Sequence, residues 1–176
     1  MRVMRVSVLS VIGFLFALLV SGCSPQTSSD TLKDADAIYY LVRHAEKTTE
    51  KNDPGLTGVG VGRANDLAAR LAGIKLDKIY SSNYIRTRDT AAPTAKAQGV
   101  AVEIYDPKDL EGFAASLLSQ TGHILVVGHS NTTPHLADLL GGKGGEPIVE
   151  ASEYNRFYVL TRSGNDIVTD IQTFGK

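Results

Sequence analysis

The sequence predicts an α/β fold, a three-layer α/β/α sandwich whose sheet is mainly parallel and carries an antiparallel hairpin at one edge. Apolar segments rich in β-branched and aromatic residues, starting at residues 37–42, alternate along the chain with segments whose apolar residues recur at helical spacing. Two further apolar runs flank a turn at residues 163–166, which is the pattern of a hairpin. The 176 residues, 43% hydrophobic and 21% charged, suffice for one domain with a sizeable core.

The first 36 residues differ in composition from the rest. Residues 1–22 combine two arginines with an apolar stretch too short to span a bilayer comfortably, which is typical of a signal peptide. Small residues precede Cys23, the only cysteine, and this arrangement resembles the bacterial lipobox, whose cysteine is lipidated; the alternative is an ordinary signal peptide with an unrelated cysteine. Residues 23–36 are polar and are expected to form a flexible tether. We therefore expect residues 37–176 to form a domain that is exported and lipid-anchored in the bacterial cell envelope, on its periplasmic side or at the cell surface.

Each element of the expected domain has its own signal. The strands are predicted at residues 37–42, 77–80, 100–105 and 123–128, with the hairpin at 155–160 and 167–172, and the helices at about 57–71, 85–98, 107–122 and 134–140. Thr57 and Asp106 are expected N-caps, with Pro107 at the first helical position. The alternating glycines at 58, 60 and 62 follow no strand directly, so close helix packing explains them better than phosphate binding. The glycines at 141–145 predict a flexible surface loop.

Polar side chains follow three of the predicted strands, at the point where each strand ends. Arg43 and His44 follow the first, Ser82 and Arg86 the second, and His129 the fourth. Taken alone, the first pair also fits the start of an ordinary loop. The carboxyl ends of parallel strands meet at one edge of a sheet, where ligands bind in open α/β folds. One guanidinium group can bind two phosphate oxygens at once through parallel N–H···O hydrogen bonds, so this grouping of residues predicts a phosphoryl site. A formal net charge of −1 without any run of Lys or Arg argues against nucleic acid as a partner.

Four ordered motifs resemble the histidine phosphatase superfamily, the phosphoglycerate mutase-like group. The resemblance is to its small members, such as the phosphohistidine phosphatases. The motifs are Leu41 Val42 Arg43 His44 Ala45 Glu46, Leu56 Thr57 Gly58 with Arg63 Ala64, Ile79 Tyr80 Ser81 Ser82 with Arg86 Thr87, and Val126 Val127 Gly128 His129.

The resemblance implies a phosphatase that works through a phosphohistidine intermediate and needs neither metal nor cofactor. His44 would be the nucleophile. Arg43 and Arg86 would bind the phosphoryl oxygens, and His129 would stabilise the charge that builds in the transition state. Ser82 would add a hydrogen bond to the phosphate, or would only cap the following helix.

The general acid is left open by the sequence. Asp106 is the first choice, because it is nearest the end of the third strand, although it would serve equally as a helix cap. Asp109 and Glu111 are the alternatives. Without an acid, good substrates would be those with good leaving groups, such as phosphohistidine, acyl phosphates and phosphoanhydrides.

The expected partners are a small phosphorylated substrate or a phosphoprotein, together with a membrane reached through the N-terminal lipid. Residues 47–53, Tyr84 and residues 141–154 are expected to wall the pocket. His123 and His135 are expected to lie outside it, and no metal-ligand spacing links the histidines. One alternative function is a non-enzymatic envelope lipoprotein that binds a phosphorylated or anionic ligand. A mutase is less favoured, because the short chain leaves little room to enclose a bisphosphate.

Overall fold

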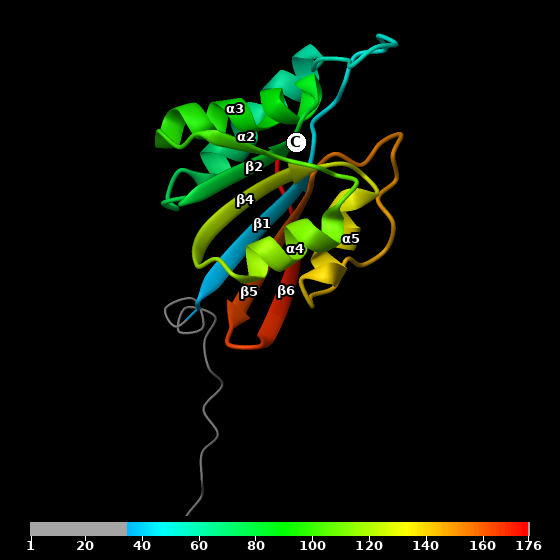
Figure 1. Ribbon diagram of the computed structural model, residues 1–176. Coiled ribbons are helices and arrows are strands. Elements are labelled where there is room, and N and C mark those ends of the chain that lie inside the picture. Colours follow the sequence, from blue (N-terminus) through cyan, green and yellow to red (C-terminus); the bar gives the residue numbers. More distant parts are fainter. Residues whose placement is uncertain (1–34, 176) are drawn as a thin grey trace, which may run out of the picture.

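The computed structural model describes residues 35–175, which form one six-stranded sheet with helices on both faces (Figure 1). The predicted signal peptide, Cys23 and nearly all of the tether lie outside these residues. In chain order the elements are β1 (Ala37–Arg43), α2 (Gly58–Leu71), β2 (Lys78–Ser82), α3 (Ile85–Gln98), β3 (Val102–Tyr105), α4 (Leu110–Leu118), β4 (Gly122–Gly128), α5 (Thr132–Leu139), β5 (Arg156–Ser163) and β6 (Asp166–Thr173). No helix within this part of the chain is long and apolar enough to cross a membrane.

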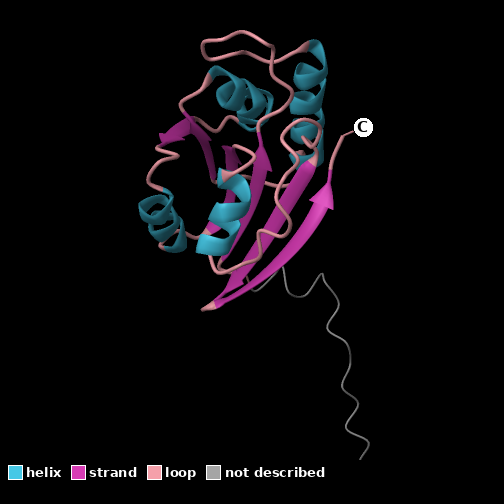
Figure 2. Cartoon of the chain, turned by 90° about the vertical axis from the view of Figure 1, so that its right-hand side faces the viewer, coloured by secondary structure: helices cyan, strands magenta, loops and turns pink. Residues whose placement is uncertain are grey.

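The order of the strands confirms the predicted fold class. They are arranged β3-β2-β4-β1-β5-β6. The pairs β1 with β4, β4 with β2, and β2 with β3 are parallel, whereas β5 is antiparallel to β1 and β6 is antiparallel to β5. Figure 2 shows the β5–β6 hairpin as the long edge of the twisted sheet. Because β1, β4 and β2 run parallel, their carboxyl ends lie together at one end of the strands.

The core lies on both faces of β1, as its continuous apolar run predicts. Successive side chains of a strand point to opposite faces. Tyr39 and Leu41 accordingly pack in one cluster with residues of α4 and α5, whereas Ile38, Tyr40 and Val42 pack in a second cluster with residues of α2 and α3. Every residue of β1 is buried. Burial on both faces fixes the strand that carries Arg43 and leads into His44.

The glycine pattern of α2 has a packing explanation. Thr57 caps the helix, because its Oγ1 accepts a hydrogen bond of 3.1 Å from the Gly60 amide. A Cβ atom at Gly60 would lie 2.2 Å from the backbone oxygen of Glu46, which is closer than any side chain tolerates. The absent side chain lets the start of α2 pack against the loop after β1. This confirms the packing interpretation for Gly60, whereas a Cβ atom at Gly58 or Gly62 would meet nothing within 4 Å.

Helix α4 begins later than the sequence predicts. Its N-cap is Asp109, whose Oδ1 accepts a hydrogen bond from the Gly112 amide. Asp106 instead accepts a hydrogen bond from the Lys108 amide, two residues ahead, and so closes a turn before the helix. The expectation that Asp106 caps a helix starting at Pro107 was wrong. Both aspartates can serve as an N-cap, and the structure uses Asp109.

The glycine-rich segment at 141–145 is tied to its surroundings, contrary to the expectation of a flexible loop. The Gly144 amide donates to Asp138 Oδ1, and the Tyr158 hydroxyl donates to the Gly144 carbonyl oxygen. A Cβ atom at Gly144 would lie 2.4 Å from the backbone oxygen of Pro134. The glycines therefore serve close packing against α5 as well as turning the chain.

Candidate active site

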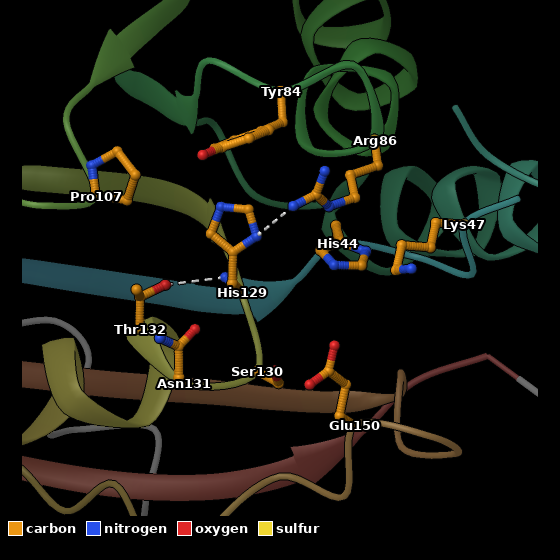
Figure 3. Close-up of a pocket in the computed structure, with 10 residues that line it drawn as sticks. All are labelled: His44, Lys47, Tyr84, Arg86, Pro107, His129, Ser130, Asn131, Thr132 and Glu150. Carbon is orange, nitrogen blue, oxygen red and sulfur yellow. Dashed lines mark hydrogen bonds between the residues drawn. The ribbon is translucent and has the colours of Figure 1, made fainter. Parts of the chain in front are cut away.

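The strand ends bring together the side chains that the sequence singled out. Arg43 is the last residue of β1 and pairs in register with Gly128, the last residue of β4. His44 and His129, one residue further on each chain segment, consequently face each other with ring centroids 5.6 Å apart. Arg86 lies in the first turn of α3 and reaches the same place from β2 (Figure 3). Parallel pairing thus assembles the site from three distant segments, as predicted.

The backbone fixes the orientation and the proton of His44. Its Nδ1 lies 2.8 Å from the carbonyl oxygen of Ala45, and a carbonyl can only accept, so the proton of the neutral ring is on Nδ1. The Ala45 amide in turn donates to Thr90 Oγ1 at 2.9 Å, which anchors the turn. Burial, together with the charges of Arg43 and Arg86, lowers the pKa of His44 to about 3. The ring is therefore neutral at physiological pH, with a free electron pair on Nε2.

Arg43 is a buried cation with unused donors. Its side chain is 1% exposed. Nη1 donates to the carbonyl oxygen of Glu153 at 2.8 Å, and the guanidinium lies over the Tyr154 ring, 4.0 Å from its centroid. Nε and Nη2 are buried and have no hydrogen-bond partner within the described chain. Buried donors are almost always paired, so two unpaired ones in a single guanidinium indicate a place for an oxyanion.

A loop that follows His44 holds Arg86. Nη1 of Arg86 lies 3.6 Å from Asp53 Oδ1, and the Arg86 guanidinium lies over the Tyr84 ring, 4.4 Å from its centroid. The same Asp53 oxygen accepts the Ile85 amide at the start of α3. Asp53 has a φ of 42°, in the left-handed region that aspartate tolerates better than most residues. The sequence reasoning did not find this link between Asp53 and Arg86.

Ser82 orients His129 instead of reaching the cavity. Ser82 is fully buried, and its Oγ lies 2.9 Å from Nε2 of His129. Because the hydroxyl donates to Thr87 Oγ1, it accepts from the His129 ring, so the proton of neutral His129 is on Nε2. Nδ1 is left facing Arg86 Nη2 at 3.5 Å. The expected helix-cap role of Ser82 was wrong, since the N-cap of α3 is Tyr84.

Burial and two guanidinium charges act on His129 as well. They lower its pKa to about 4, with burial as the largest cause, followed by Arg86 and Arg43. The site without substrate thus contains two neutral imidazoles and two permanent cations. Of these four side chains, only the two arginines carry a positive charge.

The cavity above these residues has a volume of about 550 Å³. Figure 3 shows the side chains that line it, which are His44, Lys47, Tyr84, Arg86, Pro107, His129, Ser130, Asn131, Thr132 and Glu150. Lys47, Tyr84 and Glu150 come from the three segments expected to wall the pocket. Arg88, on the same helix as Arg86, is not among these residues and bonds Asn83 instead.

None of the three carboxylates expected to supply the acid lines this cavity. Asp106 is exposed in the turn after β3. Asp109 caps α4, and together with Glu111 and His135 it lines a neighbouring hollow of about 330 Å³. The structure therefore groups Arg43, His44, Ser82, Arg86 and His129, but not Asp106. Within residues 35–175 no set of three or more His, Cys, Asp and Glu residues is arranged to hold a metal ion.

Comparison with known families agrees with this site. The sequence profile of the histidine phosphatase superfamily (branch 1) matches residues 39–115, a segment that contains Arg43, His44 and Arg86. This match spans a little less than half of the 176 residues. The match supports a phosphatase, and the structure adds His129, which lies beyond the matched segment, to the same site. No curated protein matches the sequence.

Solved structures of several phosphatases share the fold. The protein histidine phosphatase SixA complexed with tungstate superposes with a TM-score of 0.65 at 16% identity, covering 77% of this chain and 96% of its own. A SixA protein from Agrobacterium tumefaciens gives 0.56 at 22% identity, covering 80% and 98%. Mycobacterial glucosyl-3-phosphoglycerate phosphatase gives 0.60 at 14% identity, covering 78% and 97%. These likenesses establish the phosphoglycerate mutase-like fold of the domain.

Proposed function

We propose that the protein hydrolyses a phosphorylated substrate through a phosphohistidine formed on Nε2 of His44. One observation carries the proposal: the Ala45 carbonyl binds the proton on Nδ1, so Nε2 keeps its electron pair at the cavity. The lowered pKa keeps the ring neutral and hence nucleophilic. Water then attacks phosphorus, the N–P bond breaks, and phosphate leaves with His44 restored.

The cations of the site fit this chemistry. Charge on the three equatorial oxygens of a transferring phosphoryl group is stabilised by positioned donors that need no reorganisation. Arg43 offers Nε and Nη2, and Arg86 offers an Nε that likewise has no partner within the described residues. The SixA structure that shares the fold holds tungstate, a tetrahedral oxyanion, and this supports an anion site of the same kind here.

His129 is expected to take up a proton when the substrate binds. Burial and the charges of Arg86 and Arg43 lower the pKa of His129 in the empty site. A bound phosphoryl dianion offsets the two arginine charges and therefore raises this pKa. Nδ1, which carries no proton in the empty site, then becomes a donor to a phosphoryl oxygen. This proton adds positive charge where the transition state needs it.

Hydrolysis of p-nitrophenyl phosphate by the purified protein tests the proposal. His44→Ala is expected to abolish turnover and the acid-labile, base-stable phosphoryl label trapped from the wild type. Arg86→Ala should lower kcat/KM by about 10²–10³-fold, the usual loss for a donor to developing charge. Arg88→Ala is the matched control and should stay within about twofold. Chelators should not affect the rate, because arginines supply the charge.

Other outcomes would overturn the proposal. Wild-type turnover no faster than that of His44→Ala would exclude an enzyme working through His44. Competitive phosphate binding that survives His44→Ala, without turnover in either protein, would favour an envelope lipoprotein that binds an anionic ligand. Retention of the phosphoryl group with transfer to a sugar acid would indicate a mutase. Equal losses in the two arginine variants would refute the role of Arg86.

Export and anchoring are proposed on the N-terminal sequence alone. Arg2, Arg5 and the apolar stretch that ends before Cys23 support a lipoprotein signal. Full-length protein expressed in bacteria should fractionate with membranes and incorporate labelled palmitate. Cys23→Ser should lose both properties. Palmitate incorporation that persists in the Cys23→Ser variant would contradict the assignment.

A further inference from the structure

A phosphomonoester with a poor leaving group needs a proton donor beside the leaving oxygen. The carboxylates after β3 do not line the cavity of His44. Within the described chain, one carboxyl group does, that of Glu150 in the loop between α5 and β5. In Figure 3 this side chain projects from the loop towards the side of the cavity where His44 and His129 lie.

The turn that carries Glu150 is held in place by its own hydrogen bonds. The Glu153 amide donates to the carbonyl oxygen of Val149 at 2.8 Å, and the Val149 amide donates to Glu153 Oε2 at 3.0 Å. Ile148, immediately before the turn, is buried in the core. Glu150 therefore occupies a defined position in an exposed loop.

The same turn is joined to the phosphate-binding arginine. The Glu153 carbonyl accepts the hydrogen bond from Arg43 Nη1, and Tyr154 lies against the guanidinium of Arg43. The charge of Glu150 is near enough to Arg43 to oppose the lowering of the pKa of that arginine. The position of Glu150 is thereby set relative to the group that binds the phosphoryl oxygens.

The carboxyl group of Glu150 is uncommitted. No hydrogen bond or ion pair of its side chain occurs among residues 35–175, whereas the Glu153 carboxylate beside it is bound by Arg156. An uncommitted carboxyl at the wall of a catalytic cavity is available to exchange a proton with substrate. The geometry points to Glu150 as the general acid and base of the reaction, an inference that rests on the proposed function.

The proton balance of the two steps is complete. His44 Nε2 forms the bond to phosphorus while the bond from phosphorus to the ester oxygen breaks, and Glu150, acting in the protonated form of its carboxyl group, gives its proton to that oxygen, releasing an alcohol. In the second step Glu150, now a carboxylate, takes a proton from the water that attacks phosphorus, and the N–P bond breaks. Phosphate is released, His44 is neutral and Glu150 is protonated again.

This role defines the substrate class. With a proton donor in the cavity, esters of alcohols become substrates alongside phosphoramidates and aryl phosphates, whose leaving groups depart more readily. Asn131 and Thr132 line the same cavity and offer polar groups to an alcohol that carries further hydroxyls. We therefore infer alkyl phosphomonoesters as substrates.

The dependence of rate on the leaving group tests the inference. kcat/KM is measured for p-nitrophenyl phosphate, phenyl phosphate and glycerol phosphate with wild type, Glu150→Gln and Asp106→Asn. For Glu150→Gln, kcat/KM on p-nitrophenyl phosphate should stay within about threefold, because this constant reports only the first step and nitrophenolate leaves without a proton. On glycerol phosphate it should fall by about 10²–10⁴-fold, the range for general acid catalysis. Asp106→Asn, in an exposed turn outside the cavity, is the control and should match the wild type on all three.

Each other result decides against Glu150. An equal loss on all three esters would show that its charge, and not its proton, matters. No loss, a selective loss in Asp106→Asn, or a wild type that hydrolyses p-nitrophenyl phosphate but not glycerol phosphate would overturn the inference while leaving His44 chemistry intact. Failure of His44-dependent p-nitrophenyl phosphate hydrolysis would instead overturn the proposed function, and the role of Glu150 with it.

Discussion

Acid should destabilise this fold through its two active-site histidines, and the size of the effect follows from their pKa values. Burial is the main cause that lowers the pKa of His44 to about 3 and that of His129 to about 4. In the unfolded chain both ionise at about 6.5, so below that pH the unfolded chain binds protons that the folded chain does not. Stability therefore falls as the pH falls from about 6.5 towards 4. At pH 5, each histidine should cost the fold about 2 kcal/mol, from roughly 1.5 pH units at about 1.4 kcal/mol each.

Urea-induced unfolding of the purified protein near pH 7.5 and near pH 5, in buffers without phosphate, measures this cost. His44→Asn keeps a donor for the Ala45 carbonyl, and His129→Gln keeps a donor for Ser82, but neither amide titrates. Between the two pH values, each variant should lose about 2 kcal/mol less stability than the wild type. Comparing variants with the wild type cancels the contribution of every other group. The same pH dependence in all three proteins would mean that the folded state protonates its imidazoles, and would refute the reasoning.

Two further predictions concern the framework of the site. Gly60→Ala places a methyl group against the Glu46 backbone and should lower the free energy of unfolding by about 1–3 kcal/mol, as overpacking does. Gly62→Ala adds a methyl group that meets nothing within 4 Å and should raise the free energy of unfolding by about 0.5–1 kcal/mol. Equal effects of the two variants in urea titrations would contradict the packing argument. Ser82→Ala removes the hydrogen-bond acceptor of the His129 ring and should lower kcat on p-nitrophenyl phosphate by about tenfold with little change in KM, because the transition-state charge is stabilised less. A rise in KM without a fall in kcat would instead place Ser82 in substrate binding.

The sequence was sufficient to predict the part of the site that topology assembles. A continuous apolar run identifies a strand buried on both faces, and parallel pairing then forces the residues after each strand to the same edge. Arg43, His44 and His129 were predictable for this reason, because β1 and β4 end in register. Arg86 was predictable from its place in the first turn of the helix after β2.

Other contacts depend on where loops travel, and no local pattern encodes that. Asp53 reaches Arg86 across 33 positions of the chain through a residue with positive φ. Ser82 was placed at the right edge, but its hydroxyl was taken up by Thr87 and His129, a choice set by packing. Asp106 failed for the opposite reason. The local sequence around Asp106 is typical of both a helix start and a turn, and in the structure it forms a turn.

The loop before β5 explains how a buried cation stays ready for an anion. Arg43 is 1% exposed, and burying an unpaired charge is costly unless its surroundings compensate. A carboxylate in direct contact would compensate fully, but it would also compete with phosphate. Glu153 avoids this, because it presents its carbonyl oxygen to Arg43 while its carboxylate is bound by Arg156 at 2.6 Å. Tyr154 adds the face of its ring, which stabilises the cation without neutralising it. The guanidinium is thus held by a neutral acceptor and a neutral ring, and its positive charge is not neutralised, as the proposed phosphoryl site requires.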